Sequence, residues 1–170
     1  MITSNRTAIV TGGASGIGKA IATRLARDGI AVAIADKDEK QAAEVASNIQ
    51  NGPQIISLGV DVSDRNSVEN MIELSYERLG SLDILICNAG IMDRAPFMDM
   101  EEDFWENVLN TNLGGVFRCA QVAARYMIAD SKGGRIVNVA SNSGIFGGRG
   151  RAAYGASKAG IINLTQTMAI

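Results

Sequence analysis

Short apolar runs alternate along the chain with longer segments in which apolar residues recur every three or four positions. The apolar runs predict strands over residues 6–11, 30–36, 54–61, 82–87 and 135–140. The periodic segments predict helices over residues 16–28, 37–51, 64–80, 101–130 and 151–170, the fourth of them bent near Gly114 and Gly115. Two segments are predicted as loops: residues 91–100, which contain Pro96, and the glycine-rich residues 142–150.

An alternation of strands with long helices is typical of βαβ units and of a parallel sheet. The right-handed connections of such units predict an α/β fold with a doubly wound parallel sheet, the Rossmann fold, and helices on both faces. No linker, repeat or low-complexity segment interrupts the pattern, so we expect residues 1–170 to form a single domain.

Composition and charge narrow the class of protein. The formal net charge is −2 and no basic stripe is present, which argues against a nucleic-acid partner. No apolar run approaches the ~20 residues that span a bilayer, and the N-terminus does not read as a secretory signal. The two cysteines, Cys87 and Cys119, lie in apolar surroundings and are expected to be buried thiols. We therefore expect a cytoplasmic protein with no membrane contact.

The sequence contains no histidine. This excludes Ser-His-Asp and Cys-His catalysis and removes the commonest zinc ligand, and we expect no metal site. Acid–base chemistry at neutral pH must then fall to Tyr, Lys, Asp, Glu or Cys.

A glycine-rich turn over residues 11–18 joins the first predicted strand to the first predicted helix. Gly12 would permit the sharp turn, Gly16 would let the backbone approach a pyrophosphate, and Gly18 would allow close packing of helix on strand. The helix N-terminus would offer free N–H groups to the phosphates. The alternative is a tight turn that is rich in glycine for backbone reasons only.

Two carboxylates follow at the same edge of the sheet. Asp36 ends the second strand, where it can accept both ribose hydroxyls of an adenosine and repel a 2′-phosphate. This favours NAD over NADP, as does Ser15 in place of a basic residue, whereas the neighbouring Lys37 weakens the argument. Asp61 ends the third strand. The alternatives are a helix N-cap for Asp36 and a helix-start residue for Asp61.

Tyr154 and Lys158 lie four residues apart in the last predicted helix, and therefore on one face of it. A nearby ammonium group stabilises the phenolate form of a tyrosine, which can then exchange a proton near neutral pH. Ser141 follows the fifth strand and could hydrogen-bond a substrate oxygen, although it could equally be a turn serine. Asn112 could brace the expected bend by a hydrogen bond.

Together these motifs resemble the classical short-chain dehydrogenase/reductase family. They are Thr11-Gly12-x-x-x-Gly16-x-Gly18, Asp61-Val62, Asn88-Ala89-Gly90, Asn112, Ser141 and Tyr154-x-x-x-Lys158, in matching order and spacing over the whole chain. The family's usual Asn-Asn-Ala-Gly begins here with Cys87, which should point away from the cofactor.

The resemblance implies a role for each matched residue. Tyr154 would be the general acid and base, and Lys158 would favour its ionisation and hold the nicotinamide ribose. Ser141 would orient the substrate oxygen, and Asn112 would hold a water molecule that links Lys158 to solvent. The implied cofactor-binding residues are Gly12, Ser15, Gly16, Ile17, Gly18, Asp36, Asp61, Val62, Asn88, Ala89, Gly90, Tyr154 and Lys158.

The implied activity is hydride transfer between NAD(H) and a secondary alcohol or ketone, such as a polyol, sugar or small hydroxyketone. A 3-oxoacyl thioester reductase and an inactive nucleotide-binding fragment are the alternatives. Family members continue beyond the catalytic helix, so we expect a C-terminally truncated chain that lacks the last strands and the substrate lid. The resemblance also implies a homodimer or homotetramer of the full-length protein.

Overall fold

The computed structural model describes residues 6–49 and 52–170. Five parallel strands form one sheet in the order β3-β2-β1-β4-β5. The strands are β1 (Thr7–Thr11), β2 (Ala31–Asp36), β3 (Ile55–Gly59), β4 (Ile84–Cys87) and β5 (Arg135–Asn138). The chain thus builds outward from β1 in one direction and then in the other, which confirms the predicted doubly wound α/β fold.

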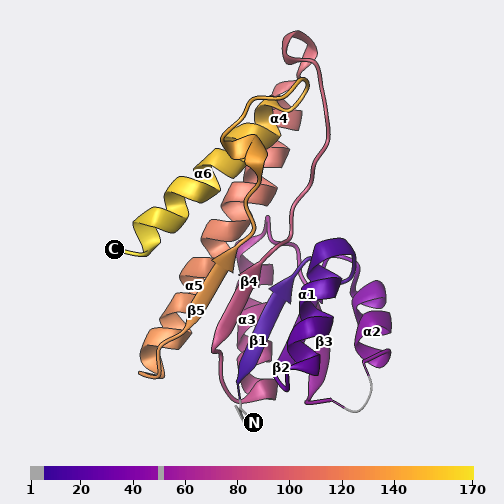
Figure 1. Cartoon of the computed structure of the whole chain (residues 1–170), viewed down its shortest axis with the longest axis vertical. Coiled ribbons are helices and arrows are strands. Elements are labelled where there is room, and N and C mark those ends of the chain that lie inside the picture. The colour runs from indigo at the N-terminus through magenta and orange to yellow at the C-terminus, as the bar shows by residue number, and fades with distance from the viewer. Residues whose placement is uncertain (1–5, 50–51) are drawn as a thin grey trace.

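Helices cover both faces of this sheet (Figure 1). The helices α1 (Gly16–Arg27) and α2 (Glu39–Ser47) lie on one face, and α3 (Arg65–Leu79) and α5 (Gly115–Ala129) lie on the other. The helices α4 (Glu102–Leu109) and α6 (Ala152–Met168) extend beyond the carboxyl ends of the strands. Two short 3-10 turns, η1 (Phe97–Asp99) and η3 (Asn142–Gly144), lie in the two predicted loops.

Alternation along β1 divides the core into two layers. Ala8 and Val10 pack in the layer under α1 and α2, whereas Ile9 packs in the layer that contains Met71 and Ile72 of α3. All five side chains are fully buried. Successive residues of a strand point to opposite faces, so an unbroken apolar run is what a strand covered on both sides requires.

The predicted helix over residues 101–130 is not continuous. A π-helical segment, η2 (Asn110–Gly114), separates α4 from α5. The predicted helix over residues 37–51 is shorter in the structure at both ends. It begins at Glu39 because Asp38 caps its N-terminus by accepting a hydrogen bond from the Gln41 N–H, and it ends at Ser47. Residues 50–51, where that helix was predicted to end, lie outside the described residues.

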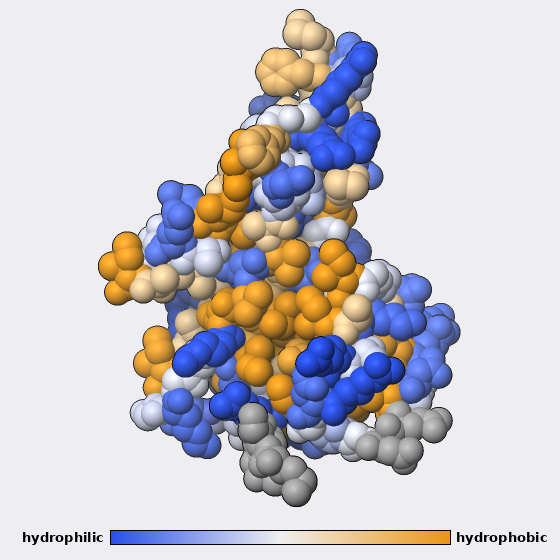
Figure 2. Space-filling model, viewed as in Figure 1, coloured by the Kyte–Doolittle hydropathy of each residue, from blue (hydrophilic) through white to orange (hydrophobic). Residues whose placement is uncertain are grey.

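Part of one sheet face carries no helix. Figure 2 shows apolar side chains gathered on this face, over the strands that α1 and α2 leave open. Val137 of β5 is 50% exposed there. Among the described helices, none is both long enough and apolar enough to cross a membrane.

Candidate active site

A cavity of about 490 Å³ opens where the first four strands end. Most of the predicted cofactor-binding residues line it: Gly12, Ser15, Gly16, Ile17, Asp36, Asp61, Val62, Asn88, Ala89 and Gly90. Gly18, Tyr154 and Lys158 are not among its lining residues. Sequence reasoning missed Asn107 and Thr111, which come from α4 and η2 and also line the cavity.

The glycine turn packs so tightly that side chains are excluded at Gly12, Gly13 and Gly18. A Cβ on Gly13 would lie 2.9 Å from the Val10 carbonyl oxygen. A Cβ on Gly12 would lie 2.8 Å from the Ala89 Cα, and one on Gly18 would overlap the Gly12 carbonyl oxygen. Gly16 differs, because a Cβ there would meet no atom within 4 Å and its φ is +51°. Gly16 therefore serves the left-handed backbone and leaves open space in front of the α1 N-terminus.

The end of β4 is fastened to this turn by hydrogen bonds. The Asn88 amide nitrogen donates to the Thr11 and Gly12 carbonyl oxygens, each at 3.1 Å. The Thr11 hydroxyl oxygen accepts from the main-chain N–H groups of Asn88 and Ala89 at 3.1 and 3.2 Å. Cys87 is buried on the far side, in contact with the core under α5. The neighbouring Cys119 thiol and burial raise the pKa of Cys87 well above its usual range.

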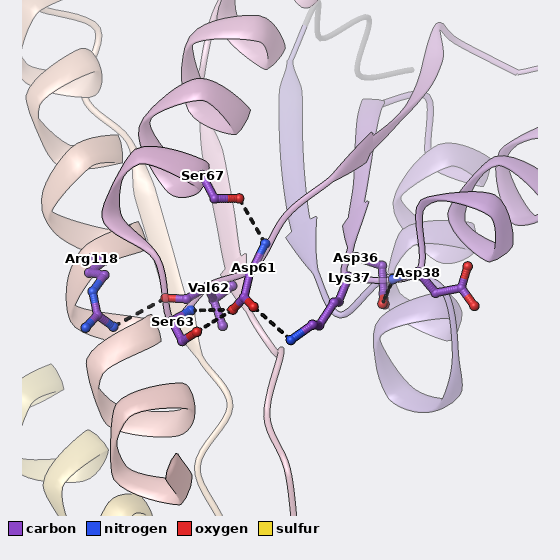
Figure 3. A network of polar contacts seen from close by, with 8 residues as sticks. All are labelled: Asp36, Lys37, Asp38, Asp61, Val62, Ser63, Ser67 and Arg118. Atoms are coloured by element: carbon purple, nitrogen blue, oxygen red, sulfur yellow. Dashed lines mark hydrogen bonds and ion pairs between the residues drawn. The ribbon is translucent and has the colours of Figure 1, made fainter. Parts of the chain in front are cut away.

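Both predicted carboxylates line the cavity, and the Lys37 side chain lies between them (Figure 3). The Asp36 oxygens accept main-chain N–H groups, from Ala14 at 3.0 Å and from Asp38 at 3.1 Å. Neither carboxylate is a helix N-cap, because Asp38 caps α2 and Asp64 caps α3. The N-cap alternative for Asp36 is therefore not what the structure contains. Asp61 does organise the chain just before α3, since its carboxylate accepts the Ser63 N–H and its own N–H donates to the Ser67 hydroxyl, and its role in cofactor binding stays a prediction.

Asp61 is held from two sides. Lys37 Nζ donates to one carboxylate oxygen at 2.8 Å, and the Ser63 N–H and hydroxyl donate to the other at 2.9 and 2.5 Å. These donors, with Lys37 contributing most, lower the pKa of Asp61 to about 2. The carboxylate is therefore ionised at neutral pH.

Tyr154 and Lys158 project from the same face of α6. Lys158 Nζ lies 5.7 Å from the centre of the Tyr154 ring and donates to the Val139 carbonyl oxygen at 2.7 Å. Burial lowers the pKa of Lys158. A Cβ on Gly90 would lie 3.9 Å from Lys158 Nζ, so this ammonium group borders the cavity's Gly90 edge.

Ser141 caps the η3 turn that precedes α6. Its hydroxyl oxygen accepts from the Ser143 N–H at 3.1 Å and donates to the Asn142 amide oxygen at 3.3 Å. It is partly exposed at the carboxyl end of the β5 segment. Ser141 is therefore a turn serine whose hydroxyl is still open to a hydrogen bond with a substrate oxygen.

Asn112 is fully buried within η2. Its amide oxygen accepts from the Ile91 N–H at 2.8 Å, and its amide nitrogen donates to the Ile91 carbonyl oxygen and to the Ser157 hydroxyl. The side chain therefore braces the bend, as one of the two readings of the sequence predicts. The implied water relay to Lys158 stays a prediction.

The two predicted loops meet around a second cavity, of about 540 Å³. It is lined by residues 95–97 and 143–152 together with Gly155, Ala156 and Ala159 of α6. The Ala95 N–H donates to the Gly150 carbonyl oxygen at 3.2 Å, which ties one loop to the other. Phe97 and Phe146 are 75% and 70% exposed, so the loops present apolar surface beside α6.

The family model for short chain dehydrogenases matches residues 6–170. The chain is 39% identical over 170 residues to 3beta-hydroxysteroid dehydrogenase 2 of Eggerthella lenta. The match covers 99% of this chain and 65% of that protein. It is 40% identical over 166 residues to a 3-oxoacyl-acyl-carrier-protein reductase of Staphylococcus aureus, covering 96% of this chain and 67% of that one.

The crystal structure of a short chain dehydrogenase from Mycobacterium smegmatis superposes with a TM-score of 0.94. The two are 32% identical, and the match covers 98% of this chain and 70% of the crystallised one. Sequence and structure agree with the motifs at the carboxyl edge of the sheet, and the chain belongs to the short-chain dehydrogenase/reductase family.

Proposed function

We propose that the protein transfers hydride between NAD(H) and a secondary alcohol or ketone, such as a polyol, sugar or small hydroxyketone. The observation that carries the proposal is the pair on α6. The Lys158 ammonium lies 5.7 Å from the Tyr154 ring centre and next to Gly90 of the 490 Å³ cavity. A tyrosine that can exchange a proton, near a cavity that fits the adenosine and pyrophosphate parts of a nicotinamide cofactor, is what carbonyl reduction needs.

The cavity residues fit the adenosine and pyrophosphate parts of a nicotinamide cofactor. The free N–H groups at the α1 N-terminus face the open space in front of Gly16, where no Cβ stands in the way. Each Asp36 oxygen accepts one main-chain N–H and retains a lone pair for a ribose hydroxyl. When bound, the cofactor supplies the acceptor or donor of the hydride.

The residues of the chain move the proton. In alcohol oxidation the Tyr154 phenolate oxygen takes the hydroxyl proton while the carbinol carbon loses hydride, and in ketone reduction Tyr154 returns that proton. Ser141 donates a hydrogen bond to the same substrate oxygen. Lys158 stabilises the phenolate by its charge, and its bond to the Val139 carbonyl oxygen fixes the ammonium group in place.

A 3-oxoacyl thioester reductase is the second candidate, supported by the 40% identity to a reductase of that class. Apolar loop residues such as Phe97, Ile145 and Phe146 would suit an acyl chain as well as a small alcohol. The two candidates are separated by cofactor preference. A preference for NADPH would favour the thioester reductase, and Asp36 argues against it because its carboxylate would repel the 2′-phosphate. Assays with a 3-oxoacyl thioester and a panel of secondary alcohols, each with both cofactors, separate them.

Tyr154→Phe tests the proposal, with Tyr126→Phe as the matched control. Both substitutions remove only a phenolic oxygen, and Tyr126 lies on α5, where its ring centre is 5.1 Å from that of Tyr76 and the two rings are tilted by 52°. We expect Tyr154→Phe to lower turnover about 10²–10⁴-fold and to leave NADH binding unchanged, because only proton transfer is lost. Tyr126→Phe should keep wild-type turnover. Retained turnover in Tyr154→Phe refutes the assigned role, and NADH binding without any turnover in the wild type favours the nucleotide-binding alternative.

A further inference from the structure

An ion pair spans the mouth of the 490 Å³ cavity. Lys37 directly follows β2, and Asp61 follows β3. The Lys37 Nζ lies 2.8 Å from an oxygen of the Asp61 carboxylate (Figure 3). The two strands are neighbours in the sheet, with Asp36 in register with Gly59. The Lys37 side chain is 80% exposed and the Asp61 side chain 37% exposed, so the ion pair lies at the surface. Either residue can give up this contact and bind another ion instead.

Asp61 is the fixed partner of this pair. Its second oxygen accepts the N–H and hydroxyl of Ser63, and its own N–H donates to the Ser67 hydroxyl at 3.0 Å. Lys37 instead has a long flexible stem, and Asp61 is the only acceptor that the structure gives its ammonium group within the described residues. The position of the ammonium group is therefore set by Asp61.

Lys37 is also the only positively charged residue among the described residues that line the cavity. It directly follows Asp36, whose carboxylate faces the ribose position in the proposed function. A phosphate on that ribose could be neutralised only by a cation beside Asp36. While Lys37 is paired with Asp61, its charge is compensated and the phosphate would face two carboxylates instead.

We propose that Asp61 is a cofactor-specificity residue that acts by withholding Lys37 from a 2′-phosphate. The inference rests on the proposed function, since it takes the cavity to hold the adenosine half of the cofactor. Specificity is a difference between two affinities, and NADP binding would have to break the Lys37–Asp61 pair, whereas NAD binding would leave it in place. Asp36 then supplies direct repulsion, and Asp61 adds an indirect contribution.

The test compares adenosine 5′-monophosphate with adenosine 2′,5′-bisphosphate, because neither ligand requires turnover. Dissociation constants are measured by calorimetry for the wild type, Asp61→Asn, Lys37→Gln and the double variant. Asp61→Asn should shift the affinity ratio toward the bisphosphate about two- to fivefold, which is the scale of one exposed ion pair. In the Lys37→Gln background the same change should have less than about a twofold effect, since no ammonium is left to release.

Asp64→Asn is the matched control. It removes the same charge three residues away, keeps a side chain that can cap α3, and does not touch Lys37. We expect its affinity ratio to equal that of the wild type. An equal shift in Asp61→Asn and Asp64→Asn, or a shift that survives Lys37→Gln, overturns the inference. Binding of neither nucleotide by the wild type overturns the proposed function and this inference with it.

Discussion

Lys158 is a charged side chain inside the protein, with 5% of its surface exposed. Its ammonium nitrogen has one main-chain acceptor, the Val139 carbonyl oxygen at 2.7 Å. Burial lowers the pKa of Lys158 below its ordinary 10.5, which means that the folded state disfavours the charged form. The geometry that serves the proposed proton transfer therefore opposes folding, and stability should rise when the charge is removed.

Lys158→Met measures how much the buried charge of Lys158 destabilises the folded protein. At pH 7 we expect the variant to be more stable than the wild type by about 1–2 kcal/mol in urea unfolding. The folded wild type releases its proton at a lower pH than the unfolded chain does, so its penalty is full at neutral pH. The penalty disappears as the pH rises through the folded-state pKa toward 10.5, and the gap between the proteins should close. Lys132→Met, at an exposed turn, should show no such pH-dependent gap, and a Lys158→Met protein less stable than wild type at pH 7 contradicts the argument.

Residue spacing was enough to place Asp36 and Asp61 at one sheet edge, because strand ends of a parallel sheet meet there. It was not enough to show that Lys37 bonds to Asp61 at 2.8 Å, which depends on the register of β2 against β3. Nor could spacing distinguish an N-cap from a cavity residue. That choice was made by Asp38 and Asp64, which take the capping positions themselves.

At the scale of elements, the bend between α4 and α5 is the main departure from the predicted pattern. The sequence indicated a bend near Gly114 and Gly115, whereas the structure contains a π-helical segment over Asn110–Gly114. Asn112 lies within this segment, and its side chain bonds both main-chain groups of Ile91, 21 residues upstream. This contact joins two separate segments of the chain, so no local periodicity could reveal it.

Asn112→Ala tests how much the bend depends on this one side chain. The substitution removes the partner of the Ile91 N–H and carbonyl oxygen and one partner of the Ser157 hydroxyl. We expect a loss of about 2–4 kcal/mol in the free energy of unfolding, since buried polar groups are left unpaired. Ser157→Ala is the matched comparison and should cost only about 1 kcal/mol. Equal losses in the two variants would show that Asn112 does not hold the bend.

At the scale of the whole molecule, the alternation of strands and helices was sufficient to predict a doubly wound parallel sheet. The order of the strands follows from which face each connecting helix covers, and that depends on contacts between distant segments. The layers are unequal as a result. Both faces are covered over β2, but over β4 and β5 one face carries exposed apolar side chains, as Figure 2 shows.

This open face should govern how the 170-residue chain behaves in solution. Along the described residues β5 pairs with β4 alone, and Val137 on it is 50% exposed. Exposed apolar surface beside an unpaired strand edge favours association between molecules. We expect the chain to bind a hydrophobic dye and to sediment as larger species as its concentration rises.

Val137→Lys should weaken both effects, because a lysine on an edge strand resists pairing and solvates the patch. Gln41→Lys adds the same charge at an exposed polar residue of α2, which packs on β2 and β3 at the other end of the sheet, and should leave association unchanged. Equal effects of the two substitutions would trace association to net charge, and a monomer without dye binding would show that the face is not exposed in solution.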